Sequence, residues 1–221
     1  PTHMPTPTPR PTATPVPTPT STPVFVRRID LTLNDFVYSP ATNAIYATVP
    51  SAGGMLRGNS VTQILPAAGV LGSSVFIGSE PNKAIISDDG NTMYVRLDGS
   101  GSIREFDIAT HTAGLQFTPQ VPFRTFADWE VQPSNPKVLA FSNSEGVAIY
   151  DNGAQRPNTD DGDAYAITSI AFAGPTTLYG YDGESSGFEL VNFTVSSSGV
   201  AGVNVANGLV SGFAIQIAYS N

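Results

Sequence analysis

The amino-acid sequence predicts an all-β fold preceded by an extended tail. From Phe25 onward, short β-branched and aromatic runs alternate with clusters of Gly, Asn, Asp, Ser and Pro, which is typical of strands joined by tight turns. No segment places apolar residues at helical spacing over three turns. The chain has 221 residues. The roughly 200 that follow the tail suit one all-β domain.

Residues 1–24 form the predicted tail, in which every proline stands at an odd position and every threonine at an even one. Proline fixes φ and lacks an N–H, so this segment is expected to be an extended polyproline II spacer. Such a composition is typical of O-glycosylated stalks outside the cell or on its surface. The candidate glycosylation sites are Thr6, Thr8, Thr12, Thr14, Thr18, Thr20 and Thr22.

The composition excludes several classes of protein. Ten basic residues face 18 acidic ones, and the formal charge of −8 disfavours a nucleic-acid partner, which attracts basic surfaces. The chain has no cysteine, so neither disulfides nor thiolate chemistry contribute. No apolar run approaches the roughly 18 residues of a membrane-spanning helix, so no membrane insertion is expected.

A fourfold repeat refines the fold class. Each unit has an apolar strand, a turn of Pro, Asp, Asn, Ser or Gly, and a second apolar strand. When the units are aligned on their second strands, the matching positions are Tyr46, Tyr94, Leu139 and Tyr179. The spacings between successive positions are 48, 45 and 40 residues. This is the period of a β-propeller blade, a four-stranded antiparallel sheet whose faces are covered by neighbouring blades.

The elements follow in order along the chain. The predicted first hairpins join 36–39 to 44–47, 84–87 to 92–95, 129–132 to 137–140, and 169–172 to 177–180. The third strand of each unit is expected at 60–64, 102–106, 146–150 and 187–191. Asp88-Asp89-Gly90-Asn91 and Asp151-Asn152-Gly153 are turn sequences, because Asp and Asn bond to nearby backbone and Gly adopts positive φ. A β-sandwich with accidental periodicity is the competing architecture.

The expected propeller spans residues 25–221, with blades near 34–80, 81–122, 123–163 and 164–212 and a partial fifth blade at 213–221. The segment Phe25–Leu33 is expected to form a lone strand. Two explanations for the incomplete blade remain open: the chain is part of a longer propeller, which we favour, or another chain supplies strands to an open edge. The second explanation gives these candidate partner contacts: Phe25, Val26, Ile29, Phe213, Ile215, Ile217 and Tyr219.

Two segments link the repeat to a known family. Ser87–Val95 carries a Ser-Asp-x-Gly-Asn turn followed by a Met-Tyr-Val strand, and Ser102–Thr110 ends in Asp-Ile-Ala-Thr before His111. These motifs resemble the YVTN/lactonase-type bacterial β-propellers, in which a glycine often stands at the place of His111. The resemblance covers roughly residues 29–221 and implies a propeller, typically of seven blades. It also implies a central channel, where lactonase-like relatives hold metals with acidic and amide side chains.

Few residues suit catalysis or metal binding, and no catalytic residue is predicted. His111 is interpreted as a solvated turn residue. Asp160, Asp161 and Asp163 bring three carboxylates together around a glycine, which makes them weak candidate ligands for Ca²⁺. Their loop lacks the alternating ligands and closing Glu of an EF-hand, so a solvated loop is expected and neither a metal nor another cofactor is predicted.

The predicted inner strand of the third unit carries two further carboxylates. Asp128 and Glu130 flank Trp129, at a place where the resemblance implies channel ligands. The equivalent inner positions are taken as Tyr38, Ile86 and Ala171. These are mostly not metal-binding residue types, so no channel metal site is expected. Trp129 is expected to pack between blades.

These observations favour a non-enzymatic scaffold outside the cell or on its surface. In this interpretation the chain is a homo-oligomer or polymer, such as a filament or array, whose Pro/Thr tail docks on a neighbouring subunit. Two alternatives remain open. One is a module that binds a glycan or a surface protein through exposed aromatics such as Tyr165, Tyr181 and Phe188. The other is a lactonase-like hydrolase.

Overall fold

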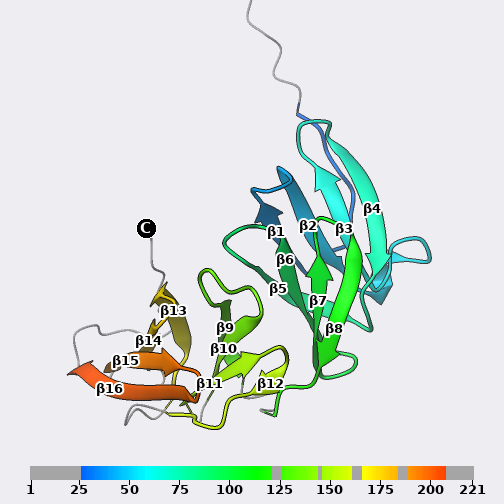
Figure 1. Ribbon diagram of the computed structural model, residues 1–221. Coiled ribbons are helices and arrows are strands. Elements are labelled where there is room, and N and C mark those ends of the chain that lie inside the picture. The colour runs from blue at the N-terminus through cyan, green and yellow to red at the C-terminus, as the bar shows by residue number, and fades with distance from the viewer. Residues whose placement is uncertain (1–25, 121–125, 144–145, 161–165, 184–188, 208–221) are drawn as a thin grey trace, which may run out of the picture.

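The computed structural model describes residues 26–120, 126–143, 146–160, 166–183 and 189–207. In these ranges the chain forms four four-stranded antiparallel sheets and one short 3₁₀ helix, η1 (Ser51–Gly53) (Figure 1). The all-β prediction is therefore confirmed. None of the helical structure in these ranges approaches the length and apolarity needed to cross a membrane.

Each sheet is built from four strands that are consecutive in the chain. The first sheet contains β1 (Asp35–Ser39), β2 (Ala44–Val49), β3 (Ser60–Leu65) and β4 (Val70–Phe76). The second contains β5 (Pro81–Ile86), β6 (Thr92–Leu97), β7 (Ser102–Asp107) and β8 (Thr112–Phe117). The third contains β9 (Phe126–Val131), β10 (Val138–Asn143), β11 (Gly146–Asp151) and β12 (Ala154–Gln155). The fourth contains β13 (Ser169–Gly174), β14 (Thr177–Tyr181), β15 (Glu189–Ser196) and β16 (Gly199–Asn207).

The sheets are arranged as blades around a common centre. The first strand of each sheet contacts the first strand of the next, in the order β1, β5, β9 and β13. Figure 1 shows these strands on the concave side of the array and the fourth strands toward the outside. This is the arrangement of a β-propeller, as the repeat predicts.

The cross-strand register explains the repeated tyrosines and corrects the sequence alignment at one unit. Tyr46, Tyr94 and Tyr179 lie opposite Val37, Ile85 and Ala171 of their first strands. In the third sheet the equivalent pair is Ala140 opposite Glu130. The alignment on Leu139 is one residue off, because Gln132 pairs with Val138 across a longer turn than the one between Ser87 and Thr92.

Turn chemistry fixes two of these hairpins. Gly90 adopts φ +71° in the β5–β6 turn, where Asp89 Oδ1 accepts hydrogen bonds from Ser87 Oγ and from the Asn91 N–H. In the β11–β12 turn Asn152 and Gly153 have φ values of +48° and +78°. Only Gly enters this left-handed region without a steric cost, while Asn tolerates it better than most residues.

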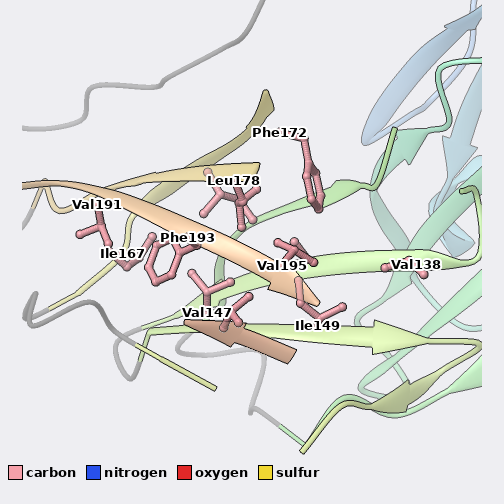
Figure 2. Close-up of a cluster of buried hydrophobic side chains, with 12 residues drawn as sticks. Val138, Val147, Ile149, Ile167, Phe172, Leu178, Val191, Phe193 and Val195 are labelled. Atoms are coloured by element: carbon pink, nitrogen blue, oxygen red, sulfur yellow. The ribbon is translucent and has the colours of Figure 1, made fainter. Parts of the chain in front are cut away.

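The hydrophobic core lies between the sheets. One cluster joins Tyr46 and Val61 of the first sheet to Met93, Val95 and Phe106 of the second. Across the third–fourth junction, Figure 2 shows the side chains of a second cluster, and its labelled members include Val138, Ile149, Phe172, Phe193 and Val195. Each sheet therefore buries an apolar face only because its neighbour covers it.

A third cluster joins the second and third sheets. It contains Tyr94 and Ile103 from the second sheet, together with Trp129, Phe141 and Tyr150 from the third. Trp129 is buried and stacks on Phe141 with ring centroids 5.9 Å apart. The expectation that Trp129 packs between blades is confirmed.

The lone strand expected at Phe25–Leu33 is not present in the described part of this segment. Residues 26–33 are assigned to no strand, and the Val26 side chain is 90% exposed. Backbone pairing with β2 begins at Asn34, whose N–H bonds to the Thr48 carbonyl. A segment with strand-forming residues becomes a strand only where a ladder partner is available, and here pairing starts later.

We predict that the junction clusters dominate stability. Replacing the fully buried Phe141 with Ala should lower the free energy of unfolding by about 3 to 5 kcal/mol, because it removes apolar contacts and leaves a cavity. Phe76→Ala is the matched control, because that ring is 65% exposed. Urea denaturation of both variants checks the prediction, which fails if the two substitutions cost the same.

Candidate functional site

A cavity of about 460 Å³ opens among the first strands of the sheets. Apolar parts of its wall come from Val37, Ile86, Trp129 and Phe172. The ionisable side chains among its described lining residues are all carboxylates: Asp88, Asp128 and Glu130. We call this space the axial cavity. A cavity of this size suits a small molecule.

Strand alternation places two of the carboxylates on the face of β9 opposite Trp129. Successive side chains of a strand point to opposite faces, so burial of Trp129 turns Asp128 and Glu130 the other way. Both therefore reach toward β13, the first strand of the fourth sheet. The Glu130 carboxylate accepts a hydrogen bond from the Phe172 N–H at 2.9 Å.

Glu130 has an unusual acidity for a glutamate. Burial, with the nearby charges of Asp128 and Asp88, raises the pKa of Glu130 to about 7, and the bond from Phe172 opposes this rise only in part. A carboxyl with a pKa near neutrality exchanges a proton readily at physiological pH. Of the described cavity residues, Glu130 is therefore the best candidate for proton transfer.

Asp128 is held by hydrogen bonds on both carboxylate oxygens. Oδ2 accepts from the Ile170 N–H at 3.0 Å and from Ser169 Oγ at 3.3 Å. Oδ1 accepts from the Trp129 N–H at 2.9 Å. The Ser142 hydroxyl, on the opposing strand, accepts from the Asp128 N–H at 3.1 Å. Asp128 thus joins two blades.

The same arrangement recurs between the first and second sheets. Asp35 Oδ2 accepts from the Ala84 N–H at 3.0 Å, and the Thr48 hydroxyl accepts from the Asp35 N–H at 3.0 Å. This equivalence shows that the position of Asp128 has a structural role. Glu130 is different, because the matching residues Val37, Ile85 and Ala171 are apolar.

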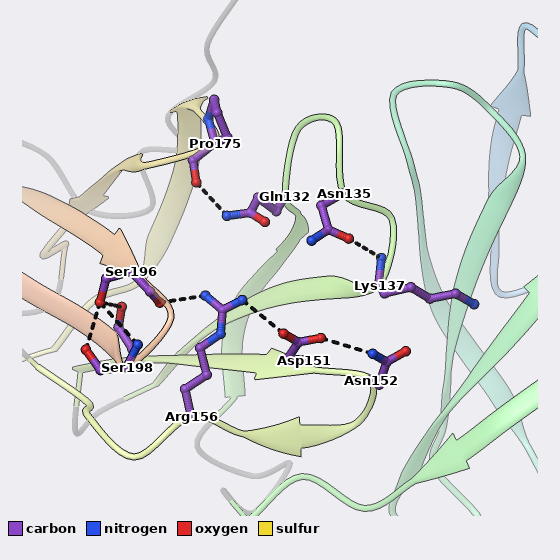
Figure 3. A network of polar contacts seen from close by, with 10 residues as sticks. Gln132, Asn135, Lys137, Asp151, Asn152, Arg156, Pro175, Ser196 and Ser198 are labelled. Carbon is purple, nitrogen blue, oxygen red and sulfur yellow. Dashed lines mark hydrogen bonds and ion pairs between the residues drawn. The ribbon is translucent and has the colours of Figure 1, made fainter.

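Further polar contacts fix the third sheet against the fourth (Figure 3). The Gln132 side-chain amide donates to the Pro175 carbonyl. The Arg156 guanidinium donates to the Ser196 carbonyl at 2.7 Å and pairs with Asp151 at 3.2 Å. The Gln132 bond joins the segments that follow β9 and β13, and the Arg156 bonds join the outer parts of the third and fourth sheets.

Asp88 lies in the exposed β5–β6 turn and lines the axial cavity. It also lines a neighbouring cavity of about 270 Å³, whose walls include Ser87, Gln132, Ser134 and Asn135. Asp88 therefore borders both spaces. Hydroxyl and amide groups in the second cavity suit a polar, hydroxylated ligand.

The alignment of inner positions made from the sequence needs correction. Tyr38 is exposed and its hydroxyl donates to Asn43, whereas Val37 lines the axial cavity. Ile86 does line the cavity, but Ile85 is the true equivalent of Glu130. Glu130 could have been identified from the sequence, because the residues at the equivalent positions, Val37, Ile85 and Ala171, are all apolar.

His111 lies in a turn, with φ +53°, but it is not simply solvated. Its Nδ1 lies 2.8 Å from Ser73 Oγ and its Nε2 lies 3.3 Å from Tyr46 Oη, both in the first sheet. The ring also stacks on Phe106. His111 therefore connects the second sheet to the first, so the interpretation as a solvated residue is wrong.

Of the three predicted metal ligands, only Asp160 lies within the described residues. Asp160 pairs with Val147 through its backbone, while Asp161 and Asp163 lie outside the described residues. Within the described ranges, no three His, Cys, Asp or Glu side chains are grouped closely enough to hold a metal ion. The Ca²⁺ suggestion at this loop remains untested.

Several other predicted sites also lie outside the described residues. They are the threonines of residues 1–24, the partial fifth blade, Phe25, Phe213, Ile215, Ile217, Tyr219, Tyr165 and Phe188. Among those that are described, Val26 is exposed, Ile29 is half-buried and Tyr181 is buried. Burial of Tyr181 removes it from any exposed aromatic cluster. The partner contacts and the extracellular location remain predictions.

Comparison with known proteins supports the fold class. No protein-family model matches the chain, and a comparison with curated proteins gives no match. Solved structures similar to it include hydrazine synthase of Kuenenia stuttgartiensis, with a TM-score of 0.58, 15% identity, and coverage of 82% of this chain and 51% of that chain.

Two further similar structures are candidate 6-phosphogluconolactonases. The Bacteroides uniformis protein has a TM-score of 0.54 and 19% identity, over 76% of this chain and 52% of its own. The Bacteroides fragilis protein has a TM-score of 0.54 and 16% identity, over 78% of this chain and 53% of its own. The chain thus spans about half the length of the solved chains that it matches.

These findings correct the functional expectation. The expectation of a structural scaffold is wrong, because the similar propellers include candidate lactonases and none of the findings supports a scaffold role. Assembly into a homo-oligomer or polymer remains a prediction. Nothing in the comparisons favours the glycan- or protein-binding module. An enzymatic role is compatible with the fold.

We predict that Glu130 makes the protein less stable as its carboxyl ionises. Its pKa is raised above the ordinary 4.5 to about 7, so the folded state holds the proton more tightly than the unfolded state between these values. Stability should fall across this window by about 2 kcal/mol, allowing for the partial exposure of the side chain.

The measurement compares urea denaturation of the wild-type protein and Glu130→Gln at pH 4.5 and pH 8. The two proteins should be about equally stable at the lower pH, and the variant more stable at the higher pH. Glu80→Gln makes the same chemical change away from the axial cavity and serves as the control. A pH-independent difference between wild type and Glu130→Gln would contradict the raised pKa.

Proposed function

We propose that the chain is a lactonase-like hydrolase that opens a lactone ring in the axial cavity. The observation that carries this proposal is the Glu130 carboxyl, which is held among the first strands with a pKa of about 7. The similar solved structures include candidate 6-phosphogluconolactonases. The motif at Ser87–Val95 also resembles the YVTN/lactonase-type repeats, which fits the same proposal.

In this proposal Glu130 is first a general base and then a general acid. The ionised carboxylate removes a proton from a water molecule as the water oxygen bonds to the lactone carbonyl carbon. The bond between that carbon and the ring oxygen then breaks. The protonated Glu130 returns its proton to the departing ring oxygen, so the products are the hydroxy acid and the original carboxylate.

The other groups around Glu130 support this role in different ways. The bond from the Phe172 N–H to Oε2 fixes the carboxylate and leaves Oε1 to accept the proton. Asp128 is occupied by the Ile170 and Ser169 donors and keeps β9 against β13. The apolar side chains of Val37, Ile86 and Phe172 limit the water around the reacting atoms. An extracellular location of this activity remains a prediction from the Pro/Thr-rich tail.

We predict that the wild-type chain hydrolyses D-glucono-δ-lactone faster than the uncatalysed background, and that Glu130→Gln loses about 100-fold or more in kcat/KM. A glutamine cannot accept the proton, and general acid–base catalysis typically contributes at least this factor. The measurement is base consumption in a pH-stat, with Glu80→Gln as the control for the loss of a carboxylate.

The pH dependence of kcat/KM is a separate test of Glu130 as the general base. Since the base must be ionised, kcat/KM of the wild-type protein should rise with pH and level off above an apparent pKa of about 7. Either the absence of turnover above background or full activity of Glu130→Gln overturns the proposal.

A further inference from the structure

We infer that the axial cavity selects uncharged, polyhydroxylated lactones over phosphorylated ones, and that Asp88 is the residue that sets this selectivity. The inference rests on the proposed hydrolase function and deepens it. It concerns the charge of the substrate, which that function leaves open.

The axial cavity carries negative charge. Asp88, Asp128 and Glu130 supply its ionisable groups, and none of the described lining residues is a lysine or arginine. The whole chain carries a formal charge of −8. A sugar phosphate brings close to two negative charges, which the carboxylates of the cavity repel. An uncharged lactone meets no such repulsion.

Asp88 is the cavity carboxylate that is placed to meet the outer part of a substrate. Asp128 is bonded to Ile170 and Ser169, and Glu130 is the proposed base, so both have other roles. Asp88 belongs to the exposed β5–β6 turn and lines both the axial cavity and the neighbouring cavity. Because Asp88 lines both cavities, a substrate that occupies both lies against it. The hydroxyl groups of such a substrate suit the polar walls of the neighbouring cavity, whereas a phosphate at this point meets a carboxylate.

Asp88 also acts on Glu130 through its charge. It is one of the carboxylates that help to raise the pKa of Glu130, after burial and together with Asp128. Removal of the Asp88 charge should therefore lower that pKa and move the pH–rate profile toward acid. A purely structural role of the turn residue predicts no such shift.

The experiment compares D-glucono-δ-lactone with its 6-phosphate at low ionic strength. For the wild type we expect kcat/KM to be at least about tenfold higher for the uncharged lactone, and we expect added salt to narrow this ratio. Asp88→Asn should reduce the ratio by about threefold or more and shift the pH–rate profile to lower pH. Asp98→Asn is the matched control, since Asp98 lies at the opposite end of β6 and makes an exposed pair with Arg96.

Binding of the corresponding unreactive lactams, D-gluconolactam and its 6-phosphate, provides a readout that does not need turnover. Calorimetry should show tighter binding of the uncharged lactam by the wild type and a smaller difference for Asp88→Asn. Equal turnover of both lactones overturns the charge inference and leaves the hydrolase proposal intact. If neither lactone is hydrolysed, the hydrolase proposal fails, and the charge inference fails with it.

Discussion

The structure depends on hydrogen-bond acceptors for the unpaired backbone N–H groups at the inner edge of each blade. The first strand of a sheet has a ladder partner on one side only, so its outer N–H groups need other acceptors. Carboxylates of the preceding blade provide them: Asp35 accepts from Ala84, Asp128 from Ile170, and Glu130 from Phe172. These bonds set the angle and spacing of the blades, while apolar clusters fill the space between them.

The candidate site arises where these carboxylates bond to the first strand of the next blade. At the position of Glu130 the other sheets have apolar residues opposite a tyrosine, whereas Glu130 lies opposite the small Ala140. The third blade therefore carries a second carboxylate beside one that already joins the blades. Two acidic groups so close together, with limited water, favour the protonated form of one of them. The packing of the third blade against the fourth thus also buries a carboxyl whose pKa suits proton transfer.

The fold was accessible from the sequence because its signals are local. Alternating apolar residues and turns such as Asp89-Gly90 define hairpins within about ten residues. The site was less accessible, because the pKa of Glu130 depends on Phe172, 42 residues away in the chain, and on Asp88 in another blade. His111 was misjudged for the same reason, since its partner Tyr46 is 65 residues distant. A one-residue difference in turn length also displaced the alignment at Leu139, because Ala140 is the residue that matches Tyr46 and Tyr94.

The junction between the second and third sheets is built differently from its neighbours. Lys83 stands where the adjoining blades have Asp35 and Asp128, so no carboxylate from this position can bridge to β9. Among the described residues, this seam is joined instead by Tyr94 to the Pro136 carbonyl and by the Lys137–Glu105 ion pair. Asp88 lies on one side of the seam and Glu130 on the other. The packing of this seam therefore sets the separation of the two carboxylates and, with it, how strongly the Asp88 charge raises the pKa of Glu130.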